Sequence, residues 1–461
     1  MRRILDFLRR PTIFLAVGLI VSAFSGSVYL LIVNLAFHDN GNYVLALQGL
    51  NTLLAAISTG VMSGIEQEMV RAVSRAIVHR LPTAPVIRRQ VKQAAWFVGV
   101  TIAGCLVLSP VLTKHFLAGS WVMYIELMIG LLGAVVSFQV RGTLSGKQDF
   151  HVFSITLLVE SFTRMLPCAL LLVAGNKDLW LYGLFFALGP VFSAVVGIVL
   201  PRIWHRPQYD GFGGDDTGEP STAAEESGGR AAANLGLLTG ATLASQLLLN
   251  AVSLLVIARY SNSHDKQTVD LAAAINSAVG LARIGIVALL PIQTPLLPKL
   301  TTAAERGDVA EVRRKTLLLV AICAGIGLAA VLVCATIGPW VMSEIMHALA
   351  DLPRWFLAAF AGATMFMMIA MILQPGLIAM NRHKSVMIGW TLGIVATVPV
   401  FLVNGDILKV TAVGAIVGPL VTSIFLAIDL WWSMRHRAAA TPAPLDTSSS
   451  PDPDPATSTL H

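Results

Sequence analysis

The feature that most constrains this chain is a series of about twelve apolar blocks, each 18 to 27 residues long. A helix of about 20 apolar residues crosses the hydrocarbon core of a bilayer. Each backbone polar group in lipid must be satisfied within its own segment, so the blocks predict transmembrane helices. Strand-type alternation is absent, which disfavours a barrel. The predicted spans are 12–37, 43–65, 93–113, 121–140, 151–173, 179–200, 233–258, 271–297, 316–338, 354–380, 386–403 and 411–432.

The charge content excludes an ordinary soluble domain. Only 13% of the residues are charged, whereas soluble domains are about one quarter charged.

The first apolar block follows Arg2, Arg3, Arg9 and Arg10, and a signal peptide has a basic start of this kind. Because the apolar region of a signal peptide is only about 7–15 residues long, this longer block is interpreted as a retained helix.

Lys and Arg are distributed unevenly between the connecting segments. With the N-terminus placed in the cytoplasm, the inner segments hold 24 of the 32 Lys and Arg residues, and the outer segments hold 6. The remaining two, Arg164 and Arg283, lie inside spans. Cytoplasmic loops carry such an excess. We therefore expect a multi-pass protein of a bacterial plasma (inner) membrane with both termini cytoplasmic. The net charge of +6 follows from this bias and attracts anionic membrane lipids, without indicating nucleic acid as a partner.

The chain divides into two halves of similar design. We expect an N-terminal six-helix lobe at 1–200, a flexible cytoplasmic linker at 201–232, a C-terminal six-helix lobe at 233–432 and a disordered cytoplasmic tail at 433–461. Gly189-Pro190 in the sixth span and Gly418-Pro419 in the twelfth lie 229 residues apart. Because six is even, both halves enter the membrane in the same direction. This predicts a parallel repeat with any substrate path between the halves.

Polar residues form stripes along four of the spans. Residues three and four apart share a helix face, and the stripes fall on the first two spans of each half. Their members are Ser22, Ser25 and Tyr29 in the first, Gln48 and Asn51 in the second, Thr242, Gln246 and Asn250 in the seventh, and Asn276 with Arg283 in the eighth. One interpretation is hydrogen bonding between helices, at about 0.6–2 kcal/mol each. The repetition in equivalent helices favours a hydrated substrate cavity.

Charged residues inside the spans are the other candidates. Burying an Arg in the middle of a membrane costs free energy, so such a residue often marks a substrate or ion pathway. The guanidinium of Arg283 suits phosphate oxygens. The alternative is that Arg283 forms a structural pair with a residue of another helix. Glu160 and Arg164 lie at i and i+4 and can neutralise each other, either as a structural pair or as part of the cavity. The four cysteines fall inside spans and show no metal or disulfide spacing, so we expect no metal site and no cofactor.

Three segments resemble a known family. They are Gly64-Ile-Glu-Gln-Glu-Met-Val-Arg71, Arg141-Gly-Thr-Leu-Ser-Gly-Lys-Gln148 and Leu297-Pro-Lys-Leu-Thr-Thr-Ala-Ala-Glu-Arg-Gly-Asp308. The chain is similar to the polysaccharide flippases of the multidrug/oligosaccharidyl-lipid/polysaccharide exporter superfamily. That resemblance implies an all-α membrane protein with two six-helix lobes around a central cavity lined by the first, second, seventh and eighth helices. It also implies alternating access and a lipid carrier pyrophosphate on the substrate.

The resemblance leads to one expected function and two alternatives. We expect a flippase or exporter, and not an enzyme, that moves a lipid-linked oligosaccharide to the outer face for cell-envelope polysaccharide synthesis, with glycan-assembly proteins as further partners. A cation-coupled multidrug antiporter of the same superfamily is the first alternative. It needs a titratable carboxylate in the cavity, and Glu160 is the one identified within a span. A membrane glycosyltransferase or polymerase using lipid-linked sugar is the second, disfavoured by the short outer loops.

Overall fold

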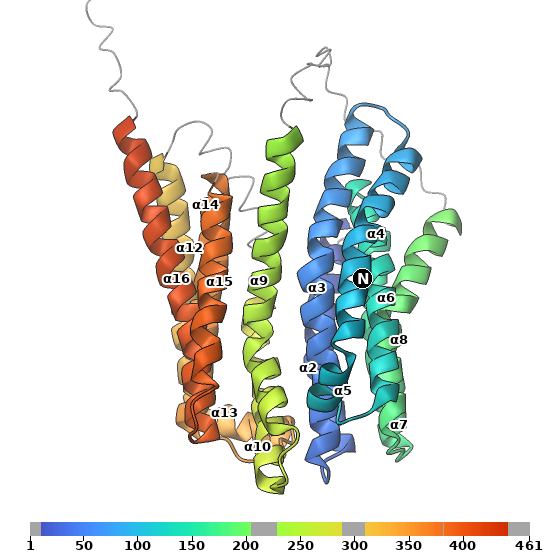
Figure 1. Cartoon of the computed structure of the whole chain (residues 1–461), viewed down its shortest axis with the longest axis vertical. Coiled ribbons are helices and arrows are strands. Elements are labelled where there is room, and N and C mark those ends of the chain that lie inside the picture. The colour runs from blue at the N-terminus through green and yellow to red at the C-terminus, as the bar shows by residue number, and fades with distance from the viewer. Residues whose placement is uncertain (1–10, 204–227, 288–308, 381, 441–461) are drawn as a thin grey trace, which may run out of the picture.

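The computed structural model describes residues 11–203, 228–287, 309–380 and 382–440 (Figure 1). These residues form long helices that run side by side, and each predicted span overlaps at least one of them, with the part of 271–297 after residue 287 outside the described residues. The described part contains no strand, and ten of its helices are long and apolar enough to cross a membrane by length and composition. The predicted all-α, polytopic fold is thereby confirmed. The predicted linker and tail lie mostly outside the described residues.

The N-terminal lobe contains seven helices among the residues described before the gap at 204–227. They are α2 (Pro11–Ala36), α3 (Gly41–Val78), α4 (Thr83–Val107), α5 (Ser109–Phe116), α6 (Trp121–Gly146), α7 (Phe150–Val173) and α8 (Leu179–Ile203). The predicted single span 93–113 is divided at Leu108 into α4 and the short α5. Pro110 lies in the first turn of α5, where its missing N–H is tolerated. The third helix therefore begins and ends earlier than predicted.

The C-terminal lobe follows the same order. Its described elements are α9 (Gly228–Tyr260), α10 (Lys266–Val287), α12 (Val309–Thr336), the short α13 (Gly338–Trp340), the π-turn η2 (Val341–Ile345), α14 (Arg354–Ala379), α15 (His383–Val400) and α16 (Ile407–Ala440). The last helix extends past the predicted end at residue 432 into the predicted tail. The linker is shorter than predicted at both ends, because α8 continues to Ile203 and α9 begins at Gly228.

Apart from the third helix of each lobe, equivalent helices have equivalent neighbours in the two lobes. In the N-terminal lobe α2 packs against α7, α3 against α6, and α8 against both α6 and α7. In the C-terminal lobe α9 packs against α15, α10 against α14, and α16 against both α14 and α15. The six-plus-six repeat predicted from the sequence is visible in this pairing.

Small residues allow α15 and α16 to approach closely. A Cβ added to Gly418 would lie 2.2 Å from Thr397 Oγ1 and 3.0 Å from the carbonyl oxygen of Gly393. The reciprocal Cβ on Gly393 would lie 3.0 Å from the carbonyl oxygen of Gly418. Small residues at such crossings are how membrane helices bring their backbones together without a hydrophobic driving force. The Gly-Pro motif of the twelfth span therefore has a packing role.

Polar side chains cap the helices where the loops turn back. Ser120 accepts a hydrogen bond from the backbone of Met123 at the start of α6, and Asp149 does the same for Val152 at the start of α7. Asp265 caps α10, accepting from the side chain and backbone of Thr268. These hydrogen bonds lower the pKa of the exposed Asp265 carboxyl. The caps satisfy N–H groups that a helix end leaves without partners.

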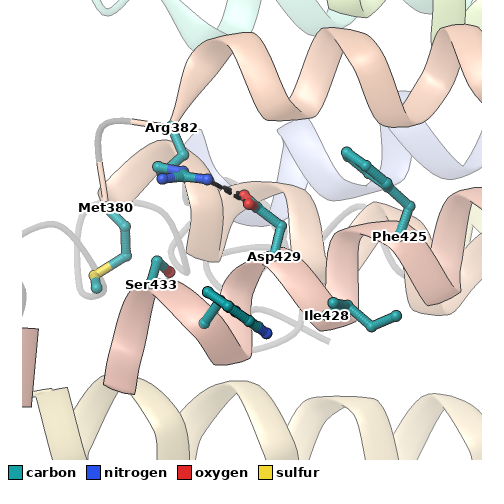
Figure 2. A pocket seen from close by; sticks show the side chains of 7 residues that line it. Met380, Arg382, Phe425, Ile428, Asp429 and Ser433 are labelled. Atoms are coloured by element: carbon teal, nitrogen blue, oxygen red, sulfur yellow. Dashed lines mark hydrogen bonds and ion pairs between the residues drawn. The ribbon is translucent and has the colours of Figure 1, made fainter. Parts of the chain in front are cut away.

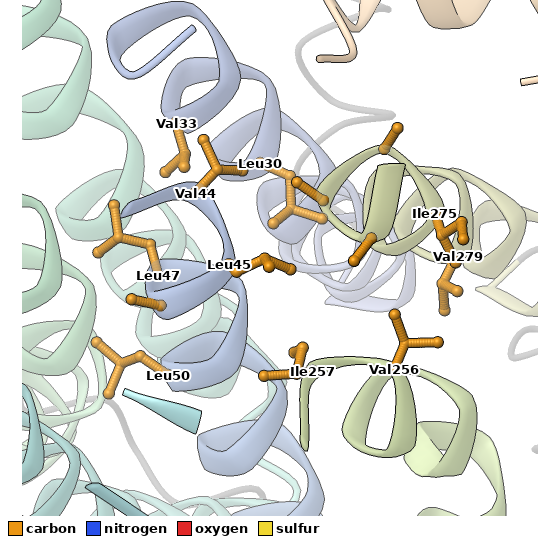
Figure 3. Close-up of a cluster of buried hydrophobic side chains, with 14 of the residues drawn as sticks. Leu30, Val33, Val44, Leu45, Leu47, Leu50, Val256, Ile257, Ile275 and Val279 are labelled. Carbon is orange, nitrogen blue, oxygen red and sulfur yellow. The ribbon is translucent and has the colours of Figure 1, made fainter. Parts of the chain in front are cut away.

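The two lobes meet along α2 and α3 on one side and α9 and α10 on the other. Figure 1 shows α3 beside α9. Figure 3 shows part of the buried apolar cluster, with Leu30 from α2, Leu45 from α3, Val256 from α9 and Ile275 from α10. These four helices are the ones on which the sequence places its polar stripes. The core thus positions the candidate site between the lobes.

Candidate functional site at the interface between the lobes

Gln48 connects the lobes through its side-chain amide. Its Nε2 lies 3.1 Å from the carbonyl oxygen of Ala273 and 3.1 Å from Ser277 Oγ, both on α10. The side chain is 1% exposed, and its Oε1 has no hydrogen-bond partner among the described residues. A predicted cavity residue is therefore placed at the contact between the lobes, at the end where α3 and α10 begin.

Asn34 makes the second connection. Its Nδ2 donates to Ser277 Oγ at 3.0 Å and to the carbonyl oxygen of Met346, just after η2, at 2.9 Å. Asn34 and Ser277 are fully buried. Since Ser277 Oγ accepts from both Asn34 and Gln48, the three side chains form one network, which we call the inter-lobe network.

Further hydrogen bonds join the lobes near this network. Ser27 of α2 donates to the carbonyl oxygen of Gly280 at 3.2 Å. Ser261, after α9, donates to the carbonyl oxygen of His115 in α5 at 2.7 Å. The charge bias predicts that the end of the molecule at which α3 and α10 begin faces the outside of the membrane. The contacts close the interface at that predicted outer end.

The remaining stripe residues differ in exposure. Asn51, Thr242 and Gln246 are half-buried, whereas Asn250 is buried and donates to the carbonyl oxygen of Gln246 at 2.7 Å. Asn276 donates to the carbonyl oxygen of Ala272 on its own helix at 3.0 Å. Its Oδ1 is buried with no partner among the described residues. Amide and hydroxyl groups from both lobes therefore lie on the facing helices α3, α9 and α10.

Two predicted residues of α2 are satisfied inside the N-terminal lobe. Ser25 is buried and donates to the carbonyl oxygen of Ser22, itself half-buried, at 2.7 Å. Tyr29 is completely buried, and its ring packs against Phe186 with centroids 4.5 Å apart. Its hydroxyl donates to the carbonyl oxygen of Tyr182 at 3.5 Å. Arg283 lies in α10, but its side chain is outside the described part, so its predicted role stays a prediction.

Glu160 lies at the centre of a buried charge cluster. It forms ion pairs with Arg164, as the i, i+4 spacing predicted, and with Arg141 of α6. Arg141 also donates to Ser193 Oγ at 2.9 Å and to Thr156 Oγ1 at 3.2 Å. Two cations and one carboxylate give the Arg141–Glu160–Arg164 cluster a net charge of +1. Arg164 lies over the Phe186 ring, 4.7 Å from its centroid.

The sequence interpretation of Arg141 was wrong. It was counted in a connecting segment after the predicted span 121–140, but α6 continues to Gly146 and buries the side chain to 7% exposure. An arginine five residues before the helix end is held inside the lobe because Glu160 neutralises it. The signal available in the sequence was the apolar and small-residue pattern that continues from Arg141 to Gly146.

Glu126 is a second buried carboxylate that sequence reasoning missed. It lies in α6, is 2% exposed, and neither carboxylate oxygen has a hydrogen-bond partner among the described residues. Its Oε2 occupies the space beside Gly183, where an added Cβ would lie 2.0 Å away. A buried carboxylate without a partner is costly when ionised. Glu160 is therefore not the only carboxylate within a span.

The described residues thus define a class of protein: a polytopic, two-lobed helical membrane protein with a polar interface between its lobes. No family model matches the sequence, and no curated protein matches it. The fold is similar to solved structures of MATE family transporters of the MOP superfamily. An inward-facing multidrug resistance MATE transporter gives a TM-score of 0.67 at 14% identity, over 90% of this chain and 95% of that chain. An outward-facing one gives 0.58 at 14% identity, over 93% and 96%.

A MATE structure in a bent conformation gives a TM-score of 0.56 at 15% identity, over 94% of this chain and 97% of that chain. The similarity covers both lobes, so it confirms the all-helical, two-lobed fold that the sequence resemblance implied. It does not distinguish the polysaccharide branch from the multidrug branch.

Proposed function

We propose that this chain is an alternating-access exporter that moves a polyprenyl-pyrophosphate-linked oligosaccharide from the cytoplasmic to the outer face of the membrane. The observation that carries the proposal is the placement of polar side chains on the four helices where the lobes meet. A path between two repeats is the general position for a substrate in transporters built this way.

Closure at one end supports alternating access. Asn34, Gln48 and Ser277 join the lobes at the predicted outer end. Of the inward-facing and outward-facing transporters compared above, the inward-facing one has the higher TM-score. A substrate would then enter from the cytoplasmic side and leave when the inter-lobe network breaks.

The chemistry of the lining helices supports a glycan over a cationic drug. In α2, α9 and the first part of α3, to residue 65, no Asp or Glu occurs, and Asp270 is the one acidic residue of α10. Asn51, Thr242 and Gln246 supply neutral donors and acceptors on α3 and α9, which suit sugar hydroxyls. The pyrophosphate would need a cation, and the proposal assigns it to Arg283, whose guanidinium can hold phosphate oxygens.

One observation favours the multidrug antiporter as a second candidate. Glu126 is a buried carboxylate without a hydrogen-bond partner among the described residues. Such a group becomes stable in a membrane interior when it carries a proton or binds a cation, as in transport coupling. Under this candidate, Glu126→Gln abolishes drug export while leaving the protein folded.

The test of the proposal is mass spectrometry of lipid-linked glycans in cells depleted of the protein. We expect one polyprenyl-linked oligosaccharide to accumulate on the cytoplasmic side and to disappear when the wild-type chain is restored. Arg283→Ala is expected not to restore the normal pool at an equal protein level. Arg354→Ala, which changes an exposed arginine at the other end of the C-terminal lobe, is the matched control and is expected to restore it.

An unchanged lipid-linked pool would refute the glycan proposal. If the depleted cells instead become sensitive to cationic drugs, and Glu126→Gln fails to protect them, the second candidate replaces the first. Full rescue by Arg283→Ala with a restored lipid pool would keep the flippase and remove Arg283 from its site.

A further inference from the structure

A cavity at the predicted cytoplasmic end of the C-terminal lobe has no role in the proposed transport path. It has a volume of about 550 Å³ and lies between the loop that joins α14 to α15 and the second half of α16 (Figure 2). Its walls are mainly apolar, with Met380, Phe425, Ile428 and Trp432, and its polar groups come from Arg382, Asp429 and Ser433.

Arg382 is held in a fixed orientation at this cavity. Its Nε donates to Asp429 Oδ2 at 3.2 Å and its Nη2 pairs with Asp429 Oδ1. The Asp429 side chain is 15% exposed, whereas that of Arg382 is 46% exposed. A guanidinium has five N–H donors in a planar fork, so the pair with Asp429 leaves further donors on the half-exposed Arg382 side chain.

The surroundings combine an excess of cations with exposed aromatic rings. Lys384 and Arg435 are also exposed, and the Arg435 guanidinium lies 4.8 Å from the centre of the Trp431 ring. Trp431 and Trp432 are both more than half exposed. Tryptophans gather at the level of lipid headgroups, so these rings place the cavity at the membrane–water boundary.

We propose that this cavity binds the headgroup of an anionic phospholipid of the cytoplasmic leaflet, with the phosphate on Arg382. Three alternatives fit less well. A cation would be repelled, because Asp429 is outnumbered by Arg382, Lys384 and Arg435. A soluble anion would leave the apolar wall of Phe425 and Ile428 uncovered. A zwitterionic lipid would cover that wall but would use the excess positive charge less fully. The inference does not depend on the substrate of the transporter.

The experiment is native mass spectrometry of the full chain in detergent, titrated with phosphatidylglycerol and separately with phosphatidylethanolamine. We expect phosphatidylglycerol to bind more tightly. Arg382→Gln is expected to weaken its binding roughly fivefold, the factor for one cation at an anionic lipid surface, and to leave phosphatidylethanolamine unchanged. Arg354→Gln, beside the exposed Trp355 at the opposite end of α14, is the matched control and is expected to change neither.

Two further variants separate binding from folding. Asp429→Asn removes the carboxylate but keeps the cation, so phosphatidylglycerol binding is expected to be equal or tighter. Arg382→Lys keeps the charge but loses the fork, so its binding is expected to fall between those of the parent and Arg382→Gln. A photoreactive phosphatidylglycerol is expected to label the segment that contains Trp432.

Equal affinity for the two lipids would overturn the proposal, as would equal losses in Arg382→Gln and Arg354→Gln. Displacement of phosphatidylglycerol by millimolar inorganic phosphate would assign the cavity to a soluble anion instead. Labelling confined to other segments would also exclude this cavity as the lipid site.

Discussion

Ser277→Ala should loosen the closed end of the interface by an amount that follows from the inter-lobe network. Ser277 Oγ accepts from Asn34 at 3.0 Å and from Gln48 at 3.1 Å, so the substitution removes two hydrogen bonds between the lobes. Such bonds between membrane helices average about 0.6 kcal/mol each. Their loss therefore shifts the equilibrium toward separated lobes by about 1.2 kcal/mol, or roughly sevenfold.

The assay is electron–electron distance measurement between two spin labels at the predicted outer end. Lys177, in the loop between α7 and α8, and Lys409, in the first turn of α16, are exposed positions suited to labelling, in a chain without its four native cysteines. We expect Ser277→Ala to enlarge the population at the longer distance. The control is Ser161→Ala, which removes a buried hydroxyl that bonds to the Leu157 carbonyl within α7.

A double change gives the larger effect. Asn34→Leu together with Gln48→Leu removes four hydrogen bonds that cross between the lobes, and the same average gives about 2.4 kcal/mol, or roughly sixtyfold. Distance distributions that match those of the Ser161→Ala control would refute the reasoning. The apolar cluster of Figure 3 would then be sufficient to hold the lobes together.

Two stability predictions concern the interiors of the lobes. Glu160→Leu should destabilise the protein by about 3–5 kcal/mol, because it leaves Arg141 and Arg164 buried without their anion. Replacing all three residues by apolar ones should restore most of that stability. Unfolding in mixed detergents measures the free energy of both variants. Gly418→Ala should cost about 1–3 kcal/mol through overpacking, while Gly325→Ala, which meets open space, should be neutral or slightly stabilising. Equal thermal midpoints for the two alanine variants would contradict the close-packing argument.

The helices could be predicted from the sequence because lipid imposes a single condition on every span. Apolar length determined the twelve predicted positions, and the structure places a helix at each. The ends were less predictable, since they depend on tertiary contacts. Arg141 shows why: an arginine normally ends a span, but a carboxylate on the neighbouring helix α7 holds it inside the lobe. The partner lies 19 residues away in the chain and is not visible in helix periodicity.

The stripes predicted which helices form the interface but not the contacts of individual residues. Gln48 reaches α10 across the interface, whereas Tyr29 packs inside its own lobe against Phe186. Helical spacing specifies a shared face and gives no information about the neighbour of that face. Asn34 and Ser277 were missed because each stands beside a stripe and not on it. Their roles follow from the way the two lobes dock, which a single sequence does not encode in its local pattern.

The placement of charged and neutral groups fits a molecule whose lobes move as units. Each ion pair recorded between described residues joins side chains of the same lobe, including Glu160 with its two arginines and Arg382 with Asp429. The inter-lobe network is made of neutral amides and a hydroxyl. Breaking a buried ion pair costs about 3–5 kcal/mol, while a neutral hydrogen bond between membrane helices averages about 0.6 kcal/mol. Under the proposed alternating access, an interface that opens in each cycle could break several neutral hydrogen bonds, whereas one or two buried ion pairs would lock it.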